Sequence, residues 1–580
     1  MVFLSFSRKE NTEEESLLVE HTYDGSVDRY GNPAIRNKTG RWGMGFLVLV
    51  NQGLATMAFF GVGVNLVLFL TRVIGQDNAE AANNVSTWLG TVYLFSLVGA
   101  YLSDSYWGRF KTCAIFQAIF ILPKGCGDEQ TPCDSHSSLH VSLFYVSLYM
   151  VALGNGGYQP NIATFGADQF DEEHPQESVS KISFFSYFYL SFNLGSLLSN
   201  TILAYYEDKG KWTLGFSAST GAAIMALLLY FKATPYYRHF KQQDDPFARF
   251  FEVFGVAIKK RKAHVPLEVD ELYEEDAEAY FDTRCRMISH THGFKFLDKA
   301  AVITSYDGSQ DKLLDNQNEK RLCTVTQVEE VKCILRLLPI WLCTIMYSVV
   351  YTQMASLFVV QGAEMKTTIG SIHIPPATMS SFDVLSVAAC IYFHSHVLNP
   401  LVIKLRKKGL TELERMGMGL IFGILSMIVA GIVEIYRLKY ATENCTDCDS
   451  RYASSLNILW QIPQFVLVGA SEVYMFVPQL EFYNGQAPEG LRSFGSALYT
   501  LSMSLGNYAS IMIVNIVMKM TTRDNMPGWI PQELNNGHLE QFYFLLAFLT
   551  TVDFGVFLYY AKAYKYVEWS VKDCKDINYV

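Results

Sequence analysis

The chain has 580 residues, of which 50% are hydrophobic and only 18% are charged. Its mean hydropathy of +0.14 is too high for an ordinary soluble enzyme, yet the charged residues are numerous enough to form aqueous loops. The net charge of -10 provides no basic footprint and argues against nucleic acid as a partner. We therefore expect an all-α, multi-pass integral membrane protein.

The apolar residues gather in a series of helix-length blocks. Most of these blocks approach the roughly 20 residues that a helix needs to cross about 30 Å of hydrocarbon. Lipid offers the backbone no hydrogen-bond partner, so helices are the expected structure. In chain order the blocks are 46–70, 85–102, 112–122, 141–153, 183–204, 214–231, 337–360, 379–394, 416–435, 456–477, 497–517 and 542–561.

The third block is too short to span a bilayer. Residues 110–122 rise only about 20 Å as a helix, against about 30 Å of hydrocarbon. Pro123, Lys124 and Gly125 follow directly and cannot extend the apolar segment. Thinning of the bilayer would cost free energy for each ångström of mismatch. We therefore predict an abnormally short third helix.

A charged and polar stretch between Pro235 and Glu330 divides the blocks into six plus six. This predicts a cytoplasmic tail (1–43), a six-helix bundle (44–234), a cytoplasmic linker (235–330), a second six-helix bundle (331–564) and a cytoplasmic tail (565–580). The layout resembles the major facilitator fold, in which the cargo binds between two halves that rock. With the N-terminus in the cytoplasm, the basic residues 259–262 also lie there, as the positive-inside bias requires.

Four short motifs resemble those of a known transporter family. Residues 184–197 read FFSYFYLSFNLGSL, which is similar to the fifth-helix signature of the proton-dependent oligopeptide transporters. The motifs GADQFD (166–171), IPPA (374–377) and PGWI (527–530) resemble the plant branch, the nitrate transporter 1/peptide transporter family. The resemblance runs from about Gly25 to Tyr564 and is greatest to members that load and unload nitrate at the xylem. It implies secondary active nitrate transport by alternating access. We expect the affinity to be low because the residues described next offer only neutral donors.

The chain departs from this family at the residues that couple transport to protons. Proton-coupled members carry Glu-x-x-Glu-Arg in helix one, and the matching positions here run from Gln52 to Thr56 without any charge. The family's helix-four lysine is replaced by Gln159, and a histidine that meets nitrate in one member is replaced by Tyr351. The resemblance therefore implies that nitrate is held by neutral donors, and it leaves import, efflux, bidirectional flux or cation exchange open.

Glu472 in helix ten is the acid that the chain keeps. An ionisable group within a membrane costs several kcal/mol and usually marks function. In relatives this acid pairs with the helix-four lysine, so here we expect Glu472 to bind substrate and to exchange protons. Asp383 is a second candidate for proton coupling, or else lies at the outer interface. Arg336 and Lys332 are candidate gating residues, although basic residues at helix ends commonly reach toward water.

Regulation and location are expected from weaker signals. Thr112 resembles a phosphorylated threonine of the family, which implies a kinase as a partner. An acidic dileucine motif at residues 13–18 resembles a vacuolar sorting signal, but a solvated tail and the plasma membrane are our expectation. Close relatives carry about a dozen further apolar residues in helix three, so we expect the longer form to be the active one.

Other functions remain open at this stage. The chain could carry a peptide, a hormone, or potassium in exchange for protons, or act as a nitrate sensor with little transport. No nucleophile with its base, metal cluster or phosphate-binding loop is evident, so we expect neither enzymatic activity nor a cofactor. The expected partners are the lipid bilayer and a small solute or ion: nitrate, with protons or potassium.

Overall fold

The computed structural model describes residues 21–22, 24–121, 138–171, 174–240, 246–262, 264, 272–273, 290–291, 293–303, 322–370, 372–442, 454–486, 492–523 and 526–566. The dileucine motif and the end of the C-terminal tail lie outside the described residues. So does half of the predicted linker.

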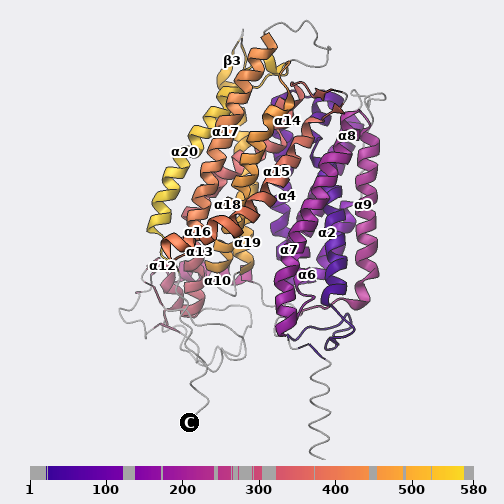
Figure 1. Cartoon of the computed structure of the whole chain (residues 1–580). Helices are drawn as coiled ribbons and strands as arrows, with labels where there is room; N and C mark the ends of the chain where they lie inside the picture. The colour runs from indigo at the N-terminus through magenta and orange to yellow at the C-terminus, as the bar shows by residue number, and fades with distance from the viewer. Residues whose placement is uncertain are drawn as a thin grey trace, which may run out of the picture.

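The N-terminal half consists of helical rods that run side by side (Figure 1). Two of these rods end in π-helical turns, and a further π-turn interrupts the fifth, as is common where helices adjust to function. In chain order the elements are α2 (Arg41–Gly63), α3 (Leu66–Phe69) and η1 (Leu70–Ile74); α4 (Asn78–Leu102) and η2 (Ser103–Trp107); α5 (Arg109–Phe120); α6 (Ser138–Ala167); α7 (Pro175–Leu198), η3 (Ser199–Leu203) and α8 (Ala204–Asp208); α9 (Trp212–Lys232) and η4 (Thr234–Tyr236).

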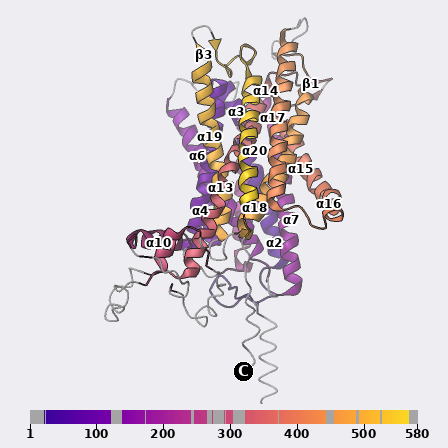
Figure 2. The ribbon, with the colours of Figure 1, turned by 90° about the vertical axis from the view of Figure 1, so that its left-hand side faces the viewer.

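The C-terminal half repeats this arrangement beside the first (Figures 1 and 2). Its elements are α13 (Val325–Thr352), η8 (Gln353–Ala355) and α14 (Leu357–Ala363); η9 (Pro376–Ser380), α15 (Ser381–Phe393), η10 (His394–Leu398) and α16 (Asn399–Arg406); α17 (Glu412–Thr442); η11 (Ile458–Gln461) and α18 (Ile462–Gln486); α19 (Arg492–Thr521); η13 (Leu534–Asn536) and α20 (Leu539–Ala563). Two small antiparallel hairpins lie at the end opposite the linker, β1 (Thr368–Ile369) with β2 (Ile372–His373), and β3 (Thr522–Arg523) with β4 (Met526–Pro527).

The linker contributes α10 (Pro246–Lys259), α12 (Lys295–Asp298) and η6 (Lys299–Ala301) at the other end of the molecule. Among the described residues, nine helices are long and apolar enough to cross a membrane. The fold confirms the predicted all-α membrane protein with two six-helix halves.

Two helices extend beyond their predicted limits. α13 begins at Val325, within the range that we assigned to the linker, because Thr324 and Gln327 form a capping box in which each side chain bonds the other's backbone N–H, both at 3.2 Å. α6 continues to Ala167, past the predicted end at residue 153. Its second part is rich in glycine and polar residues, which lowers hydropathy without preventing a buried helix.

The third helix is short, as predicted: α5 has 12 residues, a rise of about 18 Å. Its rings pack against a glycine face of α6, where a Cβ on Gly157 would clash with the Phe116 ring and a Cβ on Gly154 would lie 2.6 Å from the Phe120 nitrogen. These glycines therefore allow close helix packing. Residues 122–137, which would extend α5, lie outside the described residues.

An aromatic cluster packs the N-terminal half beyond the end of α5. Phe69 of α3 lies 5.0 Å from Phe144 of α6, 5.2 Å from Trp212 and 5.5 Å from Phe216 of α9, measured between ring centroids. All four side chains are buried. Rings from three other helices thus build a core at a depth that the short α5 does not reach.

Buried ion pairs fasten the linker-side end of the N-terminal half. Arg238, which is fully buried, lies 2.8 Å from Glu177 at the start of α7. Glu177 also accepts from the Asp171 backbone N–H at 2.9 Å, and Asp171 pairs with Arg36 at 3.0 Å. Asp168 pairs with Arg109 at 2.6 Å. The acids of the GADQFD motif thus tie together three segments that are distant in sequence.

We expect Glu177→Gln to lower the free energy of unfolding by about 3 kcal/mol or more, because Arg238 would remain buried without a counter-charge. The measurement is thermal unfolding of the purified protein in detergent, in which the apparent Tm should fall by several degrees. Glu414→Gln is the matched control, since the Arg406–Glu414 pair is 63% and 46% exposed and should contribute less than about 1 kcal/mol. Equal Tm shifts for the two variants would contradict this prediction.

Candidate functional site

A cluster of uncharged polar side chains lies where α2 meets α6. Gln52 and Thr56 on α2 are buried, one helical turn apart, and the Gln52 Nε2 donates to Thr56 Oγ1 at 3.1 Å and to Gln159 Oε1 at 3.5 Å. The Tyr158 hydroxyl donates to Asn51 Oδ1 at 2.5 Å and lies 3.3 Å from Gln52 Oε1. The cluster is a neutral hydrogen-bond network rather than a set of charges.

The members of this network differ in exposure. The Gln52 amide nitrogen is occupied by its two bonds, and the side chain is fully buried. Gln159 is partly exposed although it lies within a helix, and its oxygen is already bonded to Gln52. The Gln159 Nε2 is therefore the donor that the network offers to an adjacent solute, while Gln52 and Thr56 hold Gln159 in position.

A second polar group is formed around Glu472 of α18. Its carboxyl interacts electrostatically with the hydroxyls of four half-buried tyrosines from both halves of the protein: Tyr93 of α4, Tyr189 of α7, Tyr351 of α13 and Tyr499 of α19. The Tyr351 ring lies 5.0 Å from the Phe476 ring, edge to face, one turn along α18 from Glu472. Glu472 thus faces the N-terminal half and not lipid.

Helix α7 contacts both the helix that carries the amide cluster and the region around Glu472. Ser191 Oγ donates to the Leu49 carbonyl of α2 at 2.5 Å, and a Cβ on Gly195 would clash with the Gly53 carbonyl. Tyr189, two residues before Ser191, is within electrostatic range of Glu472. Helix α7 therefore borders both the amide cluster and Glu472, and we call the region between these two groups the chamber.

Asp383 lies beside Glu472. It is 5% exposed in the first turn of α15 and packs against α18, where a Cβ on Gly469 would lie 2.9 Å from Asp383 Oδ1. The two carboxyls interact electrostatically. The structure thus favours the buried placement of Asp383 over the interfacial one. In the described part of the chain, neither acid forms an ion pair with a basic side chain.

Lys332 and Arg336 join the linker to α13. The fully buried Lys332 Nζ lies 2.6 Å from Asp298 Oδ1 and 2.7 Å from Glu329 Oε1, and Arg336 donates to the Thr291 hydroxyl. His290, Asp298 and Glu329 are spaced closely enough to hold a metal ion. The Lys332 ammonium group, however, already lies between both carboxylates, so we assign no metal to this cluster.

Thr112 is fully buried in the first turn of α5. Its hydroxyl donates to the Gly108 carbonyl at 3.0 Å. A kinase would reach this hydroxyl only after the first turn of the helix had opened.

A charged contact between the halves was not evident from the sequence. His373 of β2 hydrogen-bonds Asp208 at the end of α8, and Arg72 of η1 lies 3.1 Å from the other oxygen of Asp208. We call these three residues the outer latch. No sequence pattern around His373 indicates that it contacts Asp208, because the two residues are 165 positions apart in the chain.

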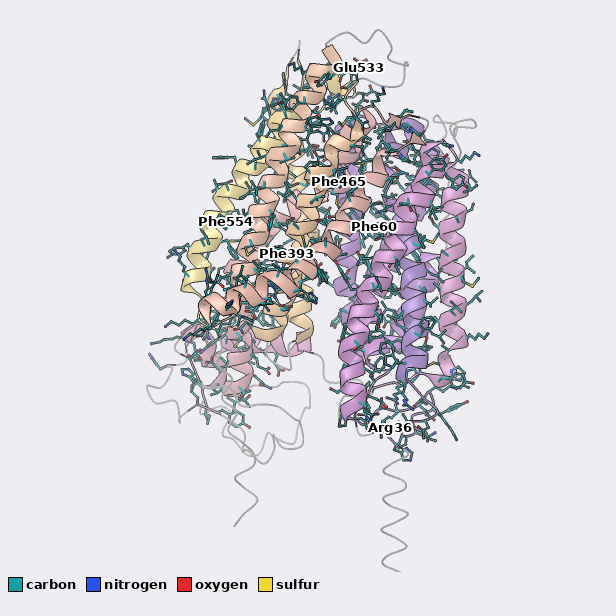
Figure 3. The ribbon with its side chains drawn as sticks, in the orientation of Figure 1. Arg36, Phe60, Phe393, Phe465, Glu533 and Phe554 are labelled. Atoms are coloured by element: carbon teal, nitrogen blue, oxygen red, sulfur yellow. The ribbon has the colours of Figure 1, made fainter. Side chains whose placement is uncertain are left out.

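Hydrogen bonds between α4 and α19 continue from the outer latch toward the chamber. Asn83 Nδ2 donates to Asn515 Oδ1 at 2.8 Å, Thr91 meets the Tyr508 hydroxyl at 3.1 Å, and Ser504 donates to the Gly90 carbonyl at 2.8 Å. At the start of α4, Asn78 Nδ2 donates to the Pro531 and Gln532 carbonyls at 3.0 Å and 2.8 Å, directly before Glu533, which Figure 3 labels at the end opposite Arg36. The halves are therefore joined on the side away from the linker.

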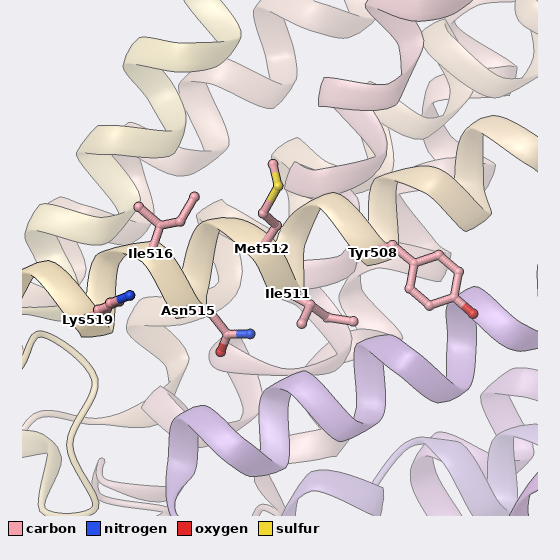
Figure 4. A pocket seen from close by; sticks show the side chains of 6 residues that line it. All are labelled: Tyr508, Ile511, Met512, Asn515, Ile516 and Lys519. Carbon is pink, nitrogen blue, oxygen red and sulfur yellow. The ribbon is translucent and has the colours of Figure 1, made fainter.

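A separate cavity of about 400 Å³ lies along α19 next to these contacts (Figure 4). Met512 and Ile516, two of its lining residues, are 59% and 48% exposed. It is a groove on the outside of α19 and not the chamber, since its lining does not include Glu472 or Gln159. The lining residues are Tyr508, Ile511, Met512, Asn515, Ile516 and Lys519.

Comparison with known proteins gives consistent matches along the chain. A family model described as the POT family matches residues 113–530. The Arabidopsis thaliana proteins NRT1/ PTR FAMILY 7.3 and 7.2 are each 59% identical to this chain. The former match covers 96% of this chain and 93% of the relative, and the latter covers 94% and 96%.

Solved structures with the same fold are more distant in sequence. An auto inhibited POT family peptide transporter superposes with a TM-score of 0.65 at 20% identity, covering 91% of this chain and 98% of its own. A POT family transporter in complex with 5-aminolevulinic acid gives a TM-score of 0.59 at 14% identity, with the same coverage of both chains.

We expect Asp208→Asn to open the outer latch, because Arg72 and His373 would lose their shared counter-charge. At about 1 kcal/mol for a partly exposed pair, the outward-open population should rise about fivefold. The measurement is the distance distribution between spin labels at Lys211→Cys and Lys519→Cys, which lie on different halves.

Glu533→Gln, an exposed outer residue, serves as the control and should leave the distances unchanged. An Asp208→Asn variant with the wild-type distance distribution would refute the assignment.

Proposed function

Because this chain belongs to the POT family of transporters, we propose that it carries nitrate by alternating access, with a proton exchanged at Glu472 and Asp383. As a member of that family it is a multi-pass secondary transporter and not an enzyme. One observation supports the finer proposal: a wall of neutral donors faces two acids that have no basic partner among the described residues.

Neutral donors favour a weakly held anion. The Gln159 amide and the Tyr351 hydroxyl are half-buried at the chamber and can donate to nitrate oxygens, while Gln52 and Thr56 set the position of Gln159. Hydrogen bonds from neutral donors are roughly half as strong as charge-assisted ones. We therefore expect the affinity for nitrate to be low.

Protonation of the acid pair couples the proton to the anion. Two carboxyl groups within electrostatic range cannot both be ionised cheaply in surroundings of low dielectric, so the pair retains at least one proton. An ionised Glu472 repels nitrate, whereas a protonated Glu472 does not. Nitrate would therefore bind together with a proton. The side of the membrane to which the chamber opens would determine the direction in which the nitrate and the proton are transported.

The same acids support a second candidate, the exchange of a cation such as potassium for protons. An ionised pair would attract a cation, and protonation would release it. The two functions predict opposite pH dependences of transport. A lower pH on the side from which the solute is loaded should increase the transport of an anion and decrease the transport of a cation.

Opening on alternate sides requires the outer latch to break while the linker side closes. In our proposal Lys332 and Arg336 contribute by holding the linker on α13, so that the linker moves with the C-terminal half. A kinase acting at Thr112 would have to trap α5 with its first turn open. We place the protein in the plasma membrane.

We expect Glu472→Gln to abolish the pH dependence of nitrate flux. In proteoliposomes the wild-type initial rate should rise at least about fivefold as the outside pH falls from about 7.5 to about 5.5, and the variant should change less than about twofold. Asp553→Asn is the matched control, because Asp553 of α20 contacts Cys343 and does not face the chamber.

A Glu472→Gln variant with the wild-type pH dependence would refute the role of this residue. Wild-type protein that moves a peptide, a hormone or potassium but no labelled nitrate would refute the substrate. A transport-dead variant that still signals nitrate in cells would indicate a sensor.

We expect Gln159→Lys to lower the KM for nitrate about three- to tenfold, since an ammonium group replaces an amide at the chamber wall. Gln159→Ala should raise the KM by a similar factor. If the transported solute is a cation, Gln159→Lys should instead lower the rate of potassium transport. If the lysine and alanine variants share one KM, Gln159 does not contact the solute.

A further inference from the structure

Helix α10 of the linker has two apolar faces, of which only one is buried. Val253, Val256 and Ala257 are at most 5% exposed and pack with Leu297 of α12 and Val328 of α13. Phe251 and Ile258 are each 67% exposed. They lie seven residues apart, hence two turns apart on the same side of the helix. The second face has no partner among the described residues.

The exposed face continues from α10 onto the next linker segment. Phe254 lies 6.5 Å from Phe296, and Phe296 lies 6.3 Å from Phe294, between ring centroids. Phe294 and Phe296 are 40% and 51% exposed. We call the exposed Phe251, Ile258, Phe294 and Phe296, together with the half-buried Phe254 that lies between them and also packs against the buried cluster, the aromatic face. A contiguous exposed surface of this kind is unusual in water and marks an interaction site.

The backbone at Phe294 is held in an uncommon conformation. Its φ of +47° and ψ of +45° are left-handed, a region that bulky residues rarely adopt. This conformation precedes α12 directly, and the Phe294 side chain remains exposed. A bulky apolar residue kept outward at a strained position favours a role in binding over a role in packing.

Basic residues border the aromatic face. Lys259, Arg261 and Lys262 are exposed at the end of α10, and Lys295 is exposed between Phe294 and Phe296. These four cations lie next to the exposed apolar side chains, an arrangement that suits an anionic binding partner.

The aromatic face lies beside the linker-side end of the helical bundle. Phe250 of α10 packs against the cluster that contains Leu337 and Trp341 of α13 and Leu498 of α19. In Figure 2, α10 projects sideways from the linker-side end of the bundle, across the direction of the long helices. An in-plane helix with apolar and basic residues at this level is typical of interfacial membrane binding.

We propose that the aromatic face inserts into the cytoplasmic leaflet, with Lys259, Arg261, Lys262 and Lys295 contacting the headgroups of anionic phospholipids. Aromatic rings prefer the boundary between headgroups and acyl chains, and juxtamembrane cations add electrostatic attraction to anionic lipid. Lys332 and Asp298 fasten this segment to α13. The lipid contact therefore acts on the C-terminal half, whatever the transported solute is.

The test is hydrogen–deuterium exchange of the full chain in nanodiscs. In discs with about 30% phosphatidylserine, amides of residues 250–262 should exchange at least about threefold more slowly than in discs of phosphatidylcholine alone. Lys259→Gln/Arg261→Gln/Lys262→Gln should abolish this difference. Lys209→Gln/Lys211→Gln/Lys519→Gln, which removes equal charge from the outer side, should preserve it.

A second variant tests the apolar contact. Phe251→Ser/Ile258→Ser leaves the buried face of α10 intact and should lose protection in both kinds of disc. Equal exchange in the two lipids for the wild type would overturn the proposal. So would protection that increases with protein concentration, since that would indicate a second copy as the occupant.

Discussion

An ionised side chain is stable in a hydrocarbon layer only when an opposite charge and hydrogen bonds replace the water that it has lost. Arg437 meets this condition in α17, where it pairs with Glu434 at 2.7 Å. Glu472 and Asp383 lie side by side without a base in the described part of the chain. Buried charges that have an opposite charge beside them stabilise the bundles, whereas buried acids without such a partner are suited to exchange protons.

The contacts between the two halves have a different character from the contacts within them. Within each half, buried rings and aliphatic chains form continuous cores. Between the halves, the outer contacts include the polar pairs Asn83–Asn515 and Thr91–Tyr508 and the latch at Asp208. Water can replace such bonds when the halves separate, so the outer side can open at a smaller cost in free energy than either core.

The short α5 is accommodated by close packing against α6 and by an aromatic cluster beyond its end. Gly154 and Gly157 admit its rings, and the cluster around Phe69 fills the core beyond its end. The described residues therefore form a closed N-terminal half with a third helix of 12 residues. The core of this half therefore packs around α5 without additional apolar residues in that helix.

The sequence by itself determined the membrane helices, the two halves and the family, because lipid permits few backbone structures and the motifs are specific. It also singled out Glu472 and Gln159 as departures from the usual charges. Only the tertiary structure decided that Gln52 lies behind Gln159, that Asp383 adjoins Glu472, and that His373 meets Asp208. These outcomes depend on helix packing and on contacts between residues far apart in the chain, which no local pattern encodes.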